Sequence, residues 1–226
     1  MSTEPTTGGI ATYRDAFAAT WPDNAPLDTV RFVVLDCETT GLDPRRDRIV
    51  SIGAVAVQEV QILLGDTFEA LLRVAHNTAA TLVHGITRSE ARFGMEEHDA
   101  LLALLAYLRD GVIVGHHIGH DLAMLETACI RHFDLRLANR HIDTLQLTRR
   151  LERDGAFAGA APLADPSLDG LCRRFGVVPY DRHTAPGDAF LTAQVFLRLL
   201  RYARRCGRDT LHSLATPGTS PKESGW

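Results

Sequence analysis

Five residues from three separated segments are of types that could carry out chemistry together. Asp36 and Glu38 lie in LDCETTGLD, Asp121 lies in VGHHIGHDLAML, and His183 and Asp188 lie in HTAPGDAF. Mg²⁺ and Mn²⁺ prefer oxygen ligands, and two such cations can hold the attacking and leaving oxygens of a phosphodiester. Histidine has an ordinary pKa near 6.5, which suits a general base that activates water. The set predicts phosphodiester hydrolysis assisted by two divalent cations, Mg²⁺ or Mn²⁺.

The elements that must position these residues follow from local pattern. The run RFVVLDCET is apolar and rich in β-branched residues, as a buried strand is, and a strand points positions i and i+2 to one side. Asp36 and Glu38 are therefore expected to share a face, with Asp36 as the bridging ligand. Asp121 is expected between a short strand and a helix. Asp188 is expected near the start of the last helix, with His183 on the loop that leads into it.

Each of these residues also has a structural interpretation. Asp36 and Glu38 could simply end a strand, and Asp121 could be a helix N-cap, a position that favours Asp. His183 could be a solvated loop histidine.

Three neighbouring histidines raise a different alternative. His116, His117 and His120, together with Asp121, could form a transition-metal site of imidazoles and one carboxylate. This alternative is less favoured, because the segment begins as a strand and neighbours on a strand point to opposite faces. We expect the three histidines to face substrate instead.

The remaining pattern predicts an α/β fold built on one mixed sheet. A second strand is expected at 48–57, and one or two more at 60–74, broken at Gly65 and Asp66. Such a meander would give three adjacent antiparallel strands. Alternating helices and strands then follow. Helices are expected at 97–109, 122–132, 145–153, 167–175 and 186–205, strands at 111–117 and 140–144, and a loop at 155–166.

Composition limits the organisation of the chain. With 226 residues and 45% hydrophobic residues, it can build one sizeable core. We expect an N-terminal extension at 1–29 with a short helix at about 10–21 as an appendage, a main domain at 30–208 and a disordered tail at 209–226. Four scattered cysteines without a C-x-x-C pair fit reduced thiols, and no run approaches the roughly 20 apolar residues of a membrane span. The expected location is cytoplasmic.

Net charge limits the mode of nucleic-acid binding. A formal charge of -4 argues against coating a polyanion by bulk electrostatics, so any contact must be local. Arg45, Arg46 and Arg48 beside the first motif could contact phosphates or form a solvated loop. Five more arginines could do the same or form an outer face, namely Arg198, Arg201, Arg204, Arg205 and Arg208.

Taken together, the motifs resemble those of the DEDDh 3′-to-5′ exonucleases, the superfamily of the proofreading subunit of bacterial DNA polymerase III and of ribonuclease T. The resemblance spans about residues 31–205. It rests on DCETTGLD, on VGHHIGHD and on HTAPGD, where the five-residue step from His183 to Asp188 marks the histidine subgroup, and also on LVHGIT at 82–87 and IDTLQL at 142–147.

This resemblance implies roles for individual residues. Asp36, Glu38, Asp121 and Asp188 would be the metal ligands and His183 the general base. Thr39, Gly41 and Leu42 would lie along the terminal nucleotide, with His84 close to the same pocket. The implied fold is ribonuclease H-like, a mixed five-stranded sheet flanked by helices.

The chain departs from the family pattern in its second motif, which usually reads His-Asn-x-x-Phe-Asp. His117 stands in place of the asparagine and His120 in place of the phenylalanine. Because aromatic faces stack on bases, this change bears on substrate preference more than on the metal site.

The expected substrate is the 3′ end of a single-stranded nucleic acid, with DNA favoured over RNA. The alternative is a partner subunit of a polymerase or other complex, docked through its termini. A homodimer is a further option, and no membrane partner is expected.

Overall fold

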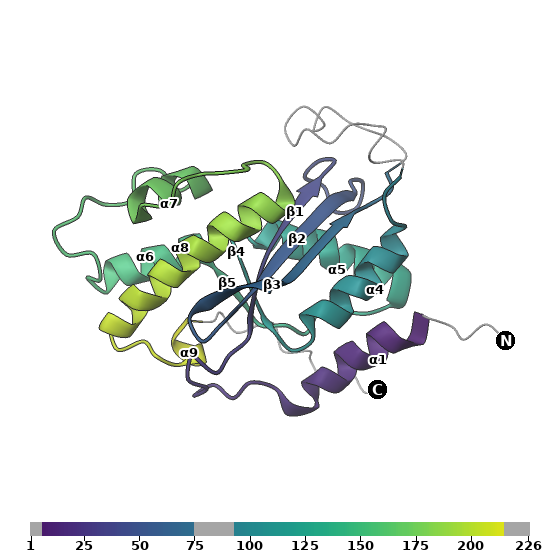
Figure 1. Ribbon diagram of the computed structural model, residues 1–226, viewed down its shortest axis with the longest axis horizontal. Helices are drawn as coiled ribbons and strands as arrows, with labels where there is room; N and C mark the ends of the chain where they lie inside the picture. Colours follow the sequence, from purple (N-terminus) through teal and green to yellow (C-terminus); the bar gives the residue numbers. More distant parts are fainter. Residues whose placement is uncertain (1–5, 75–92, 215–226) are drawn as a thin grey trace.

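The computed structural model of the chain describes residues 6–74 and 93–214 (Figure 1). The first half of the described chain carries most of the sheet: α1 (Thr6–Ala16), a 3-10 helix η1 (Phe17–Ala19), β1 (Phe32–Thr39), β2 (Ile49–Gln58) and β3 (Gln61–Leu71). Helices and short strands then alternate: α4 (Glu97–Leu108), β4 (Val112–Gly115), α5 (Gly119–Phe133), β5 (His141–Asp143), α6 (Thr144–Arg153), α7 (Leu168–Phe175), α8 (Ala185–Arg205) and α9 (Leu211–Leu214).

The strands form one five-stranded mixed sheet in the order β3-β2-β1-β4-β5. β1 and β2 are antiparallel, as are β2 and β3, whereas β4 runs parallel to both β1 and β5. The predicted α/β class and mixed five-stranded sheet are confirmed. Because β1 and β4 run in parallel, their carboxyl ends meet at one edge of the sheet, where the polar motifs begin.

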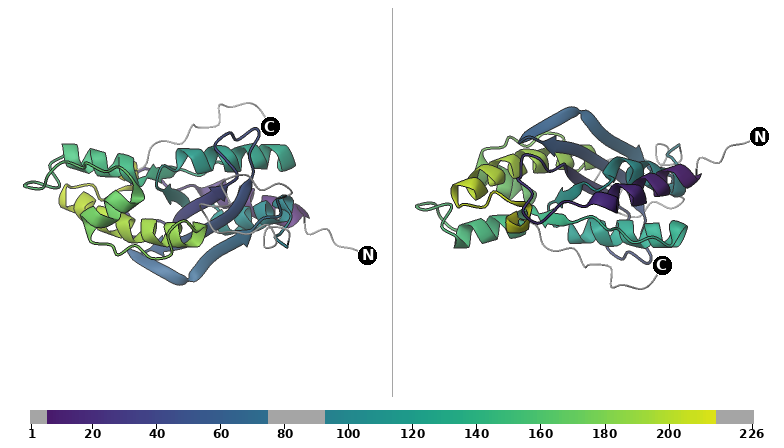
Figure 2. Two further views of the ribbon diagram at one scale, coloured as in Figure 1. Left: turned by 90° about the horizontal axis from the view of Figure 1, so that it is seen from above. Right: turned by 90° about the horizontal axis from the view of Figure 1, so that it is seen from below.

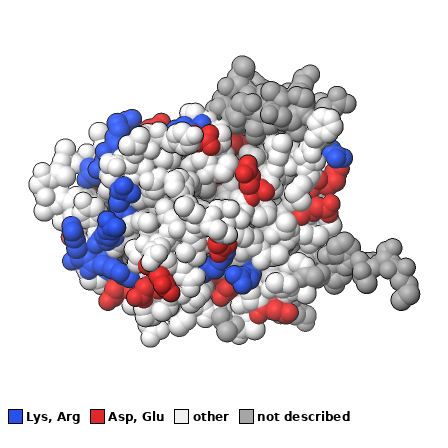
Figure 3. Space-filling view, in the orientation of Figure 1, with Lys and Arg blue, Asp and Glu red and all other residues white. Residues whose placement is uncertain are grey.

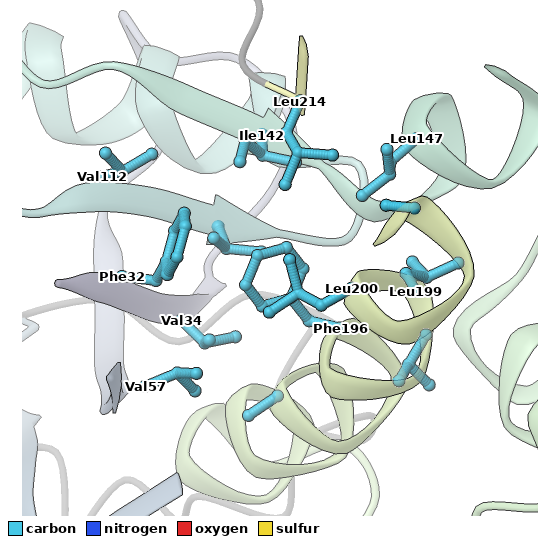
Figure 4. Close-up of a cluster of buried hydrophobic side chains, with 14 of the residues drawn as sticks. Phe32, Val34, Val57, Val112, Ile142, Leu147, Phe196, Leu199, Leu200 and Leu214 are labelled. Atoms are coloured by element: carbon cyan, nitrogen blue, oxygen red, sulfur yellow. The ribbon is translucent and has the colours of Figure 1, made fainter. Parts of the chain in front are cut away.

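Side chains of β1 alternate between the two faces of the sheet. Phe32 and Val34 belong to the core beneath α8, whereas Val33 and Leu35 belong to the core on the opposite face. Figure 4 shows the first core, in which Phe32 packs edge-to-face on Phe196 of α8 with ring centroids 5.1 Å apart. The same two-residue period places Asp36 and Glu38 on the α8 side.

The sheet is covered by helices on both faces (Figure 2). Residues of α6, α7, α8 and α9 form the core on one face, and residues of α1, α4 and α5 form the core on the other. Strands that are buried on both faces of a sheet have nearly continuous apolar sequences, and β1 and β2 have such sequences.

The third strand is single, although the sequence left open one strand or two. β3 runs without interruption from Gln61 to Leu71, but its register with β2 shifts between Val55 and Ala56. Val55 pairs with Thr67 and Ala56 with Leu63, so the intervening residues bulge out of the ladder.

The predicted N-terminal appendage is corrected, because the helix is part of the core. α1 begins at Thr6 and packs beside α4, and Tyr13 is only 2% exposed. The Tyr13 hydroxyl donates to Asn139 Oδ1 at 2.6 Å and accepts from the backbone N–H of Ala138 at 2.8 Å. These contacts join residues about 125 positions apart, which local sequence pattern does not reveal.

The predicted disordered tail from residue 209 is also corrected over the part that the structure describes. Leu211–Leu214 form α9, and Leu211 and Leu214 are buried in the core beneath α8. The backbone N–H of Leu27 donates to Asp209 O and that of Leu211 to Ala25 O, at 3.1 and 3.0 Å. The segments before β1 and after α8 are therefore hydrogen-bonded to each other.

The four cysteines are free, and three of them, Cys37, Cys129 and Cys172, are buried. Within residues 6–74 and 93–214, none of the helices is both long and apolar enough to span a membrane.

Candidate active site

The first two carboxylates lie at the end of β1. Asp36 and Glu38 are half-buried and point to the α8 side of the sheet, as the strand period predicted. Asp36 pairs with Gly53 of β2 in the antiparallel ladder. A Cβ on Gly53 would lie 2.2 Å from the backbone nitrogen of Pro186 and 2.3 Å from the carbonyl carbon of Ala185. Only glycine lets the first turn of α8 approach the strand this closely.

That first turn carries the third carboxylate. Thr184 caps α8, its hydroxyl accepting from the backbone N–H of Gly187 at 3.1 Å, and Pro186 lies where a missing N–H costs nothing. Asp188 follows in the first turn and is 8% exposed. The helix start therefore presents Asp188 to the end of β1, as predicted.

Three carboxylates converge at this point. One oxygen each from Asp36, Glu38 and Asp188 lies within 4.8 Å of the other two, the one such cluster found over the described ranges. Oxygen donors without sulfur or imidazole suit a hard cation such as Mg²⁺ or Mn²⁺ rather than a softer metal. The donor set therefore fits the divalent cation that the motifs imply.

Electrostatics support the same conclusion. Burial, together with the charges of Asp121, Asp188 and Glu38, raises the pKa of Asp36 well above its ordinary value. Burial and the neighbouring carboxylates also raise the pKa of Glu38 to about 7. Carboxylates that burial and mutual repulsion make hard to ionise are the groups that a bound cation stabilises most.

Asp121 belongs to the site but not to the three-carboxylate cluster. It lies in the first turn of α5 and is 6% exposed, and its Oδ1 accepts from the backbone N–H of Cys37 at 2.9 Å. Burial raises its pKa to about 7, against the lowering effect of its hydrogen bonds. The N-cap of α5 is Ile118, so Asp121 does not have the capping role that the structural interpretation gave it.

His183 lies on the loop before α8, where the sequence placed it. Its side chain is exposed, and its backbone has a φ of 64°, a conformation that a non-glycine residue rarely adopts. Neighbouring Thr184 holds this loop, because its hydroxyl donates to Asp181 O at 2.9 Å. The imidazole is thus exposed on the loop that leads into the helix carrying Asp188.

The residues expected along the terminal nucleotide lie at the end of β1 and on the loop that follows it. Thr39 Oγ1 donates to Gly41 O at 2.8 Å, and Leu42 is 82% exposed. Asp47 organises this loop, which sequence reasoning missed: its carboxylate accepts from Thr40 Oγ1 at 3.0 Å, and a Cβ on Gly41 would lie 2.5 Å from it. The loop that follows the two carboxylates of β1 thus exposes an apolar side chain to solvent.

The second motif divides its histidines between different surroundings. His120 Nε2 lies 3.5 Å from Thr39 Oγ1, so it borders the loop after β1, and His117 is exposed. His116 Nδ1 lies 3.0 Å from Thr144 Oγ1, and burial lowers the pKa of His116 to about 4. Within the described chain these histidines join no cluster of ligand atoms with Asp121, so the transition-metal alternative is wrong. His84 lies outside the described residues.

Arg182 is the main feature of the site that sequence reasoning missed. Its Nε donates to Asp169 Oδ1 of α7 at 2.7 Å, and its Nη1 donates to Asp188 Oδ1. The guanidinium lowers the pKa of both Asp36 and Glu38, opposing burial and carboxylate repulsion. Its position immediately before His183 was the available signal, but no spacing rule pairs it with α7.

Two of the arginines beside the first motif contact groups of their own loop. Arg48 Nη1 donates to Asp47 O at 2.8 Å, and Arg46 lies 3.6 Å from the carboxylate of Asp43. In Figure 3 basic side chains gather over α6, α7 and the C-terminal part of α8. The last turns of these helices supply Arg150, Arg153, Arg173, Arg174, Arg204 and Arg205.

Comparison with protein families decides the relationship. The model of the RNase T exonuclease family matches residues 33–196, a range that contains every carboxylate of the site. This chain belongs to that family. The DEDDh resemblance is therefore confirmed.

Individual relatives agree with this assignment. The chain is 33% identical to the DNA polymerase III PolC-type protein of Thermotoga maritima over 85% of its length, and 34% identical to a DNA polymerase III subunit epsilon-like protein of Rhodobacter capsulatus over 84%. It spans only 13% and 27% of the lengths of these two relatives.

Solved structures show the same fold. The complex of Escherichia coli exonuclease I with a dT13 oligonucleotide superposes with a TM-score of 0.68 at 20% identity, over 78% of this chain and 42% of exonuclease I. The predicted ribonuclease H-like fold is thereby confirmed.

Proposed function

We propose that this chain is a metal-dependent 3′–5′ exonuclease that releases nucleoside 5′-monophosphates from the 3′ end of a single-stranded nucleic acid. The observation that carries this proposal is the convergence of Asp36, Glu38 and Asp188 within 4.8 Å, in a chain that belongs to an exonuclease family. The loop of Leu42 follows the strand that carries Asp36 and Glu38, and the loop of His183 leads into the helix that carries Asp188.

The carboxylates would hold two divalent cations, Mg²⁺ or Mn²⁺. Asp36, Glu38 and Asp188 supply the clustered oxygens, and Asp121 joins them from α5, where its hydrogen bond with Cys37 fixes its direction. When bound, such cations act as Lewis acids on a phosphodiester and make water easier to deprotonate. The chain supplies a rigid base for them, because each ligand lies on a strand or in the first turn of a helix.

His183 would be the general base. It stands on the loop immediately before the helix that carries Asp188, and its imidazole is open to solvent, so it can accept a proton from water and pass it on. The terminal nucleotide would lie along Thr39, Gly41 and Leu42. His117 and His120 would line its other side, and His84 is proposed for the same pocket.

The substrate is proposed to be DNA, with RNA as the alternative. The relatives are named as DNA polymerase III proteins, and exonuclease I has been solved with a DNA oligonucleotide. The metal chemistry acts on phosphate and does not distinguish the sugars, so discrimination needs a contact to the 2′ position. Matched DNA and RNA strands assayed under one metal and salt condition decide between the two.

A 5′-labelled single strand tests the reaction. We expect a ladder of products shortened one nucleotide at a time from the 3′ end, dependent on added Mg²⁺ or Mn²⁺ and abolished by EDTA. Internal cuts as the first products, or turnover in EDTA, would contradict the proposal.

A second candidate function is that of a subunit in a polymerase assembly. It is favoured by the names of the relatives and by the small share of them that this chain spans. A cytoplasmic location is proposed because the relatives are named as bacterial DNA polymerase III proteins. Co-purification with a polymerase subunit would support this candidate, whereas full activity of the isolated chain as a monomer or homodimer would speak against it.

A further inference from the structure

Arg182 joins two helices through a pair of carboxylates. Its Nε donates to Asp169 Oδ1 of α7 at 2.7 Å, while its Nη1 donates to Asp188 Oδ1 of α8. The side chains of Arg182 and Asp188 are 19% and 11% exposed, and that of Asp169 is 40% exposed. The guanidinium thus has one partner inside the three-carboxylate cluster and one partner nearer to solvent.

This arrangement places a permanent positive charge where a metal ion is proposed to bind. Arginine stays protonated in proteins, so Arg182 cannot lose its charge and can only move. In the metal-free protein it offsets the repulsion among Asp36, Glu38 and Asp188. A divalent cation bound to the same carboxylates would repel the guanidinium and compete with it for Asp188.

Asp169 gives the guanidinium a place to remain. It is not one of the clustered carboxylates, and its bond is to Nε rather than to the Nη1 that contacts Asp188. The contact of Nε with Asp169 is therefore separate from the contact of Nη1 that a cation would replace.

We propose that Arg182 is a positioning residue that serves as the built-in counter-cation of the metal-free site, and that a divalent cation displaces it from Asp188 while Asp169 retains it. This inference rests on the metal site of the proposed function. Arg182 would thereby stabilise the folded protein in the absence of metal, and its competition for Asp188 would weaken metal binding.

The test compares Arg182→Gln with Asp169→Asn in the full chain, measuring Mn²⁺ affinity by calorimetry and the melting temperature in EDTA. Arg182→Gln should bind Mn²⁺ at least about fivefold more tightly, because the competing charge is gone, and should melt lower in EDTA, because the repulsion is no longer offset. Asp169→Asn should bind Mn²⁺ more weakly, because the guanidinium then has only Asp188. Arg173→Gln, which removes an arginine of α7 that pairs with Asp165, should leave Mn²⁺ affinity unchanged.

The outcomes separate this inference from the proposed function. If Arg182 only props up Asp188, Arg182→Gln will bind Mn²⁺ more weakly or with equal affinity, which overturns the inference and leaves the metal site intact. If the unaltered protein binds no Mn²⁺, the proposed metal site itself fails. Should Arg182→Gln not fold, Asp169→Asn still decides, because tighter or unchanged Mn²⁺ binding by that variant contradicts the competition.

Discussion

The carboxyl group of Asp36 has opposite consequences for stability and for activity. Its pKa is raised by burial and by the neighbouring carboxylates, so its ionised form is disfavoured in the folded, metal-free protein. An acid whose pKa is raised in the folded state destabilises that state as pH rises above the acid's ordinary pKa, and the loss is complete above the raised pKa. Asp36 is thus expected to lower stability in order to hold a cation.

Asp36→Asn tests this trade-off. We expect nuclease activity to fall about a hundredfold or more, because loss of a ligand removes several kcal/mol of stabilisation by the metal. The melting temperature in EDTA at pH 8 should rise, because the amide carries no charge for its neighbours to repel. A fall in melting temperature in EDTA would show that the carboxylate is stabilising, contrary to this account.

His116 should make stability depend on pH in the opposite direction. Burial lowers its pKa to about 4 from 6.5, so between these values the unfolded chain takes up a proton that the folded chain refuses. Stability should fall as pH drops through this window. Urea denaturation gives the free energy of unfolding at pH 7.5 and at pH 5. The decrease in this free energy between the two pH values should be about 1–2 kcal/mol smaller in His116→Gln than in the unaltered chain. Equal decreases in the two proteins would show that a group other than His116 takes up the proton on unfolding.

At the scale of elements, the contact between β2 and α8 sets the geometry of the site. Gly53→Ala should force the first turn of α8 away from the strand, because the added Cβ would meet backbone atoms of Ala185 and Pro186 rather than a movable side chain. We expect Mn²⁺ affinity to fall about tenfold or more, and stability to fall by about 1–3 kcal/mol.

Gly65→Ala is the matched control for this substitution. Gly65 lies in β3, and a Cβ there would meet no atom within 4 Å. Both metal affinity and stability should stay close to those of the unaltered chain. Equal effects of the two substitutions would mean that the close approach at Gly53 does not position Asp188.

The helices and strands are largely predictable from the sequence, whereas the tertiary contacts between them are not. The two-residue period of β1 correctly placed Asp36 and Glu38 on one face, because that period is a property of the backbone. The burial of Tyr13 against Asn139 and the joining of α7 to α8 by Arg182 depend on tertiary packing between distant segments. Neither leaves a periodic signal in the sequence, so local pattern predicts an appendage for the N-terminal helix and does not identify Arg182.

At the scale of the whole molecule, substitutions at two leucines should affect different properties. One should lower the free energy of unfolding, and the other should weaken substrate binding. Leu214 is 2% exposed and packs in the core beneath α8, whereas Leu42 is 82% exposed on the loop after β1. Leu214→Ala should lower the free energy of unfolding by about 2–5 kcal/mol, with kcat little changed at permissive temperature.

Leu42→Ala should do the reverse. Stability should change by less than about 0.5 kcal/mol, as at other exposed positions, while KM for a single strand rises. Denaturation curves and steady-state kinetics on the same two variants check both expectations. Unchanged KM in Leu42→Ala would remove this residue from the proposed pocket.

The central claim is that a free 3′ end enters a site of clustered carboxylates and is hydrolysed there. The most direct measurement compares two 5′-labelled single strands of one sequence, one with a free 3′ terminus and one with its last nucleotide inverted so that no 3′ hydroxyl is exposed. With Mn²⁺, we expect the free strand to shorten stepwise and to release nucleoside 5′-monophosphates, while the blocked strand persists and Asp36→Asn degrades neither. Equal degradation of the two strands by the unaltered protein would contradict it.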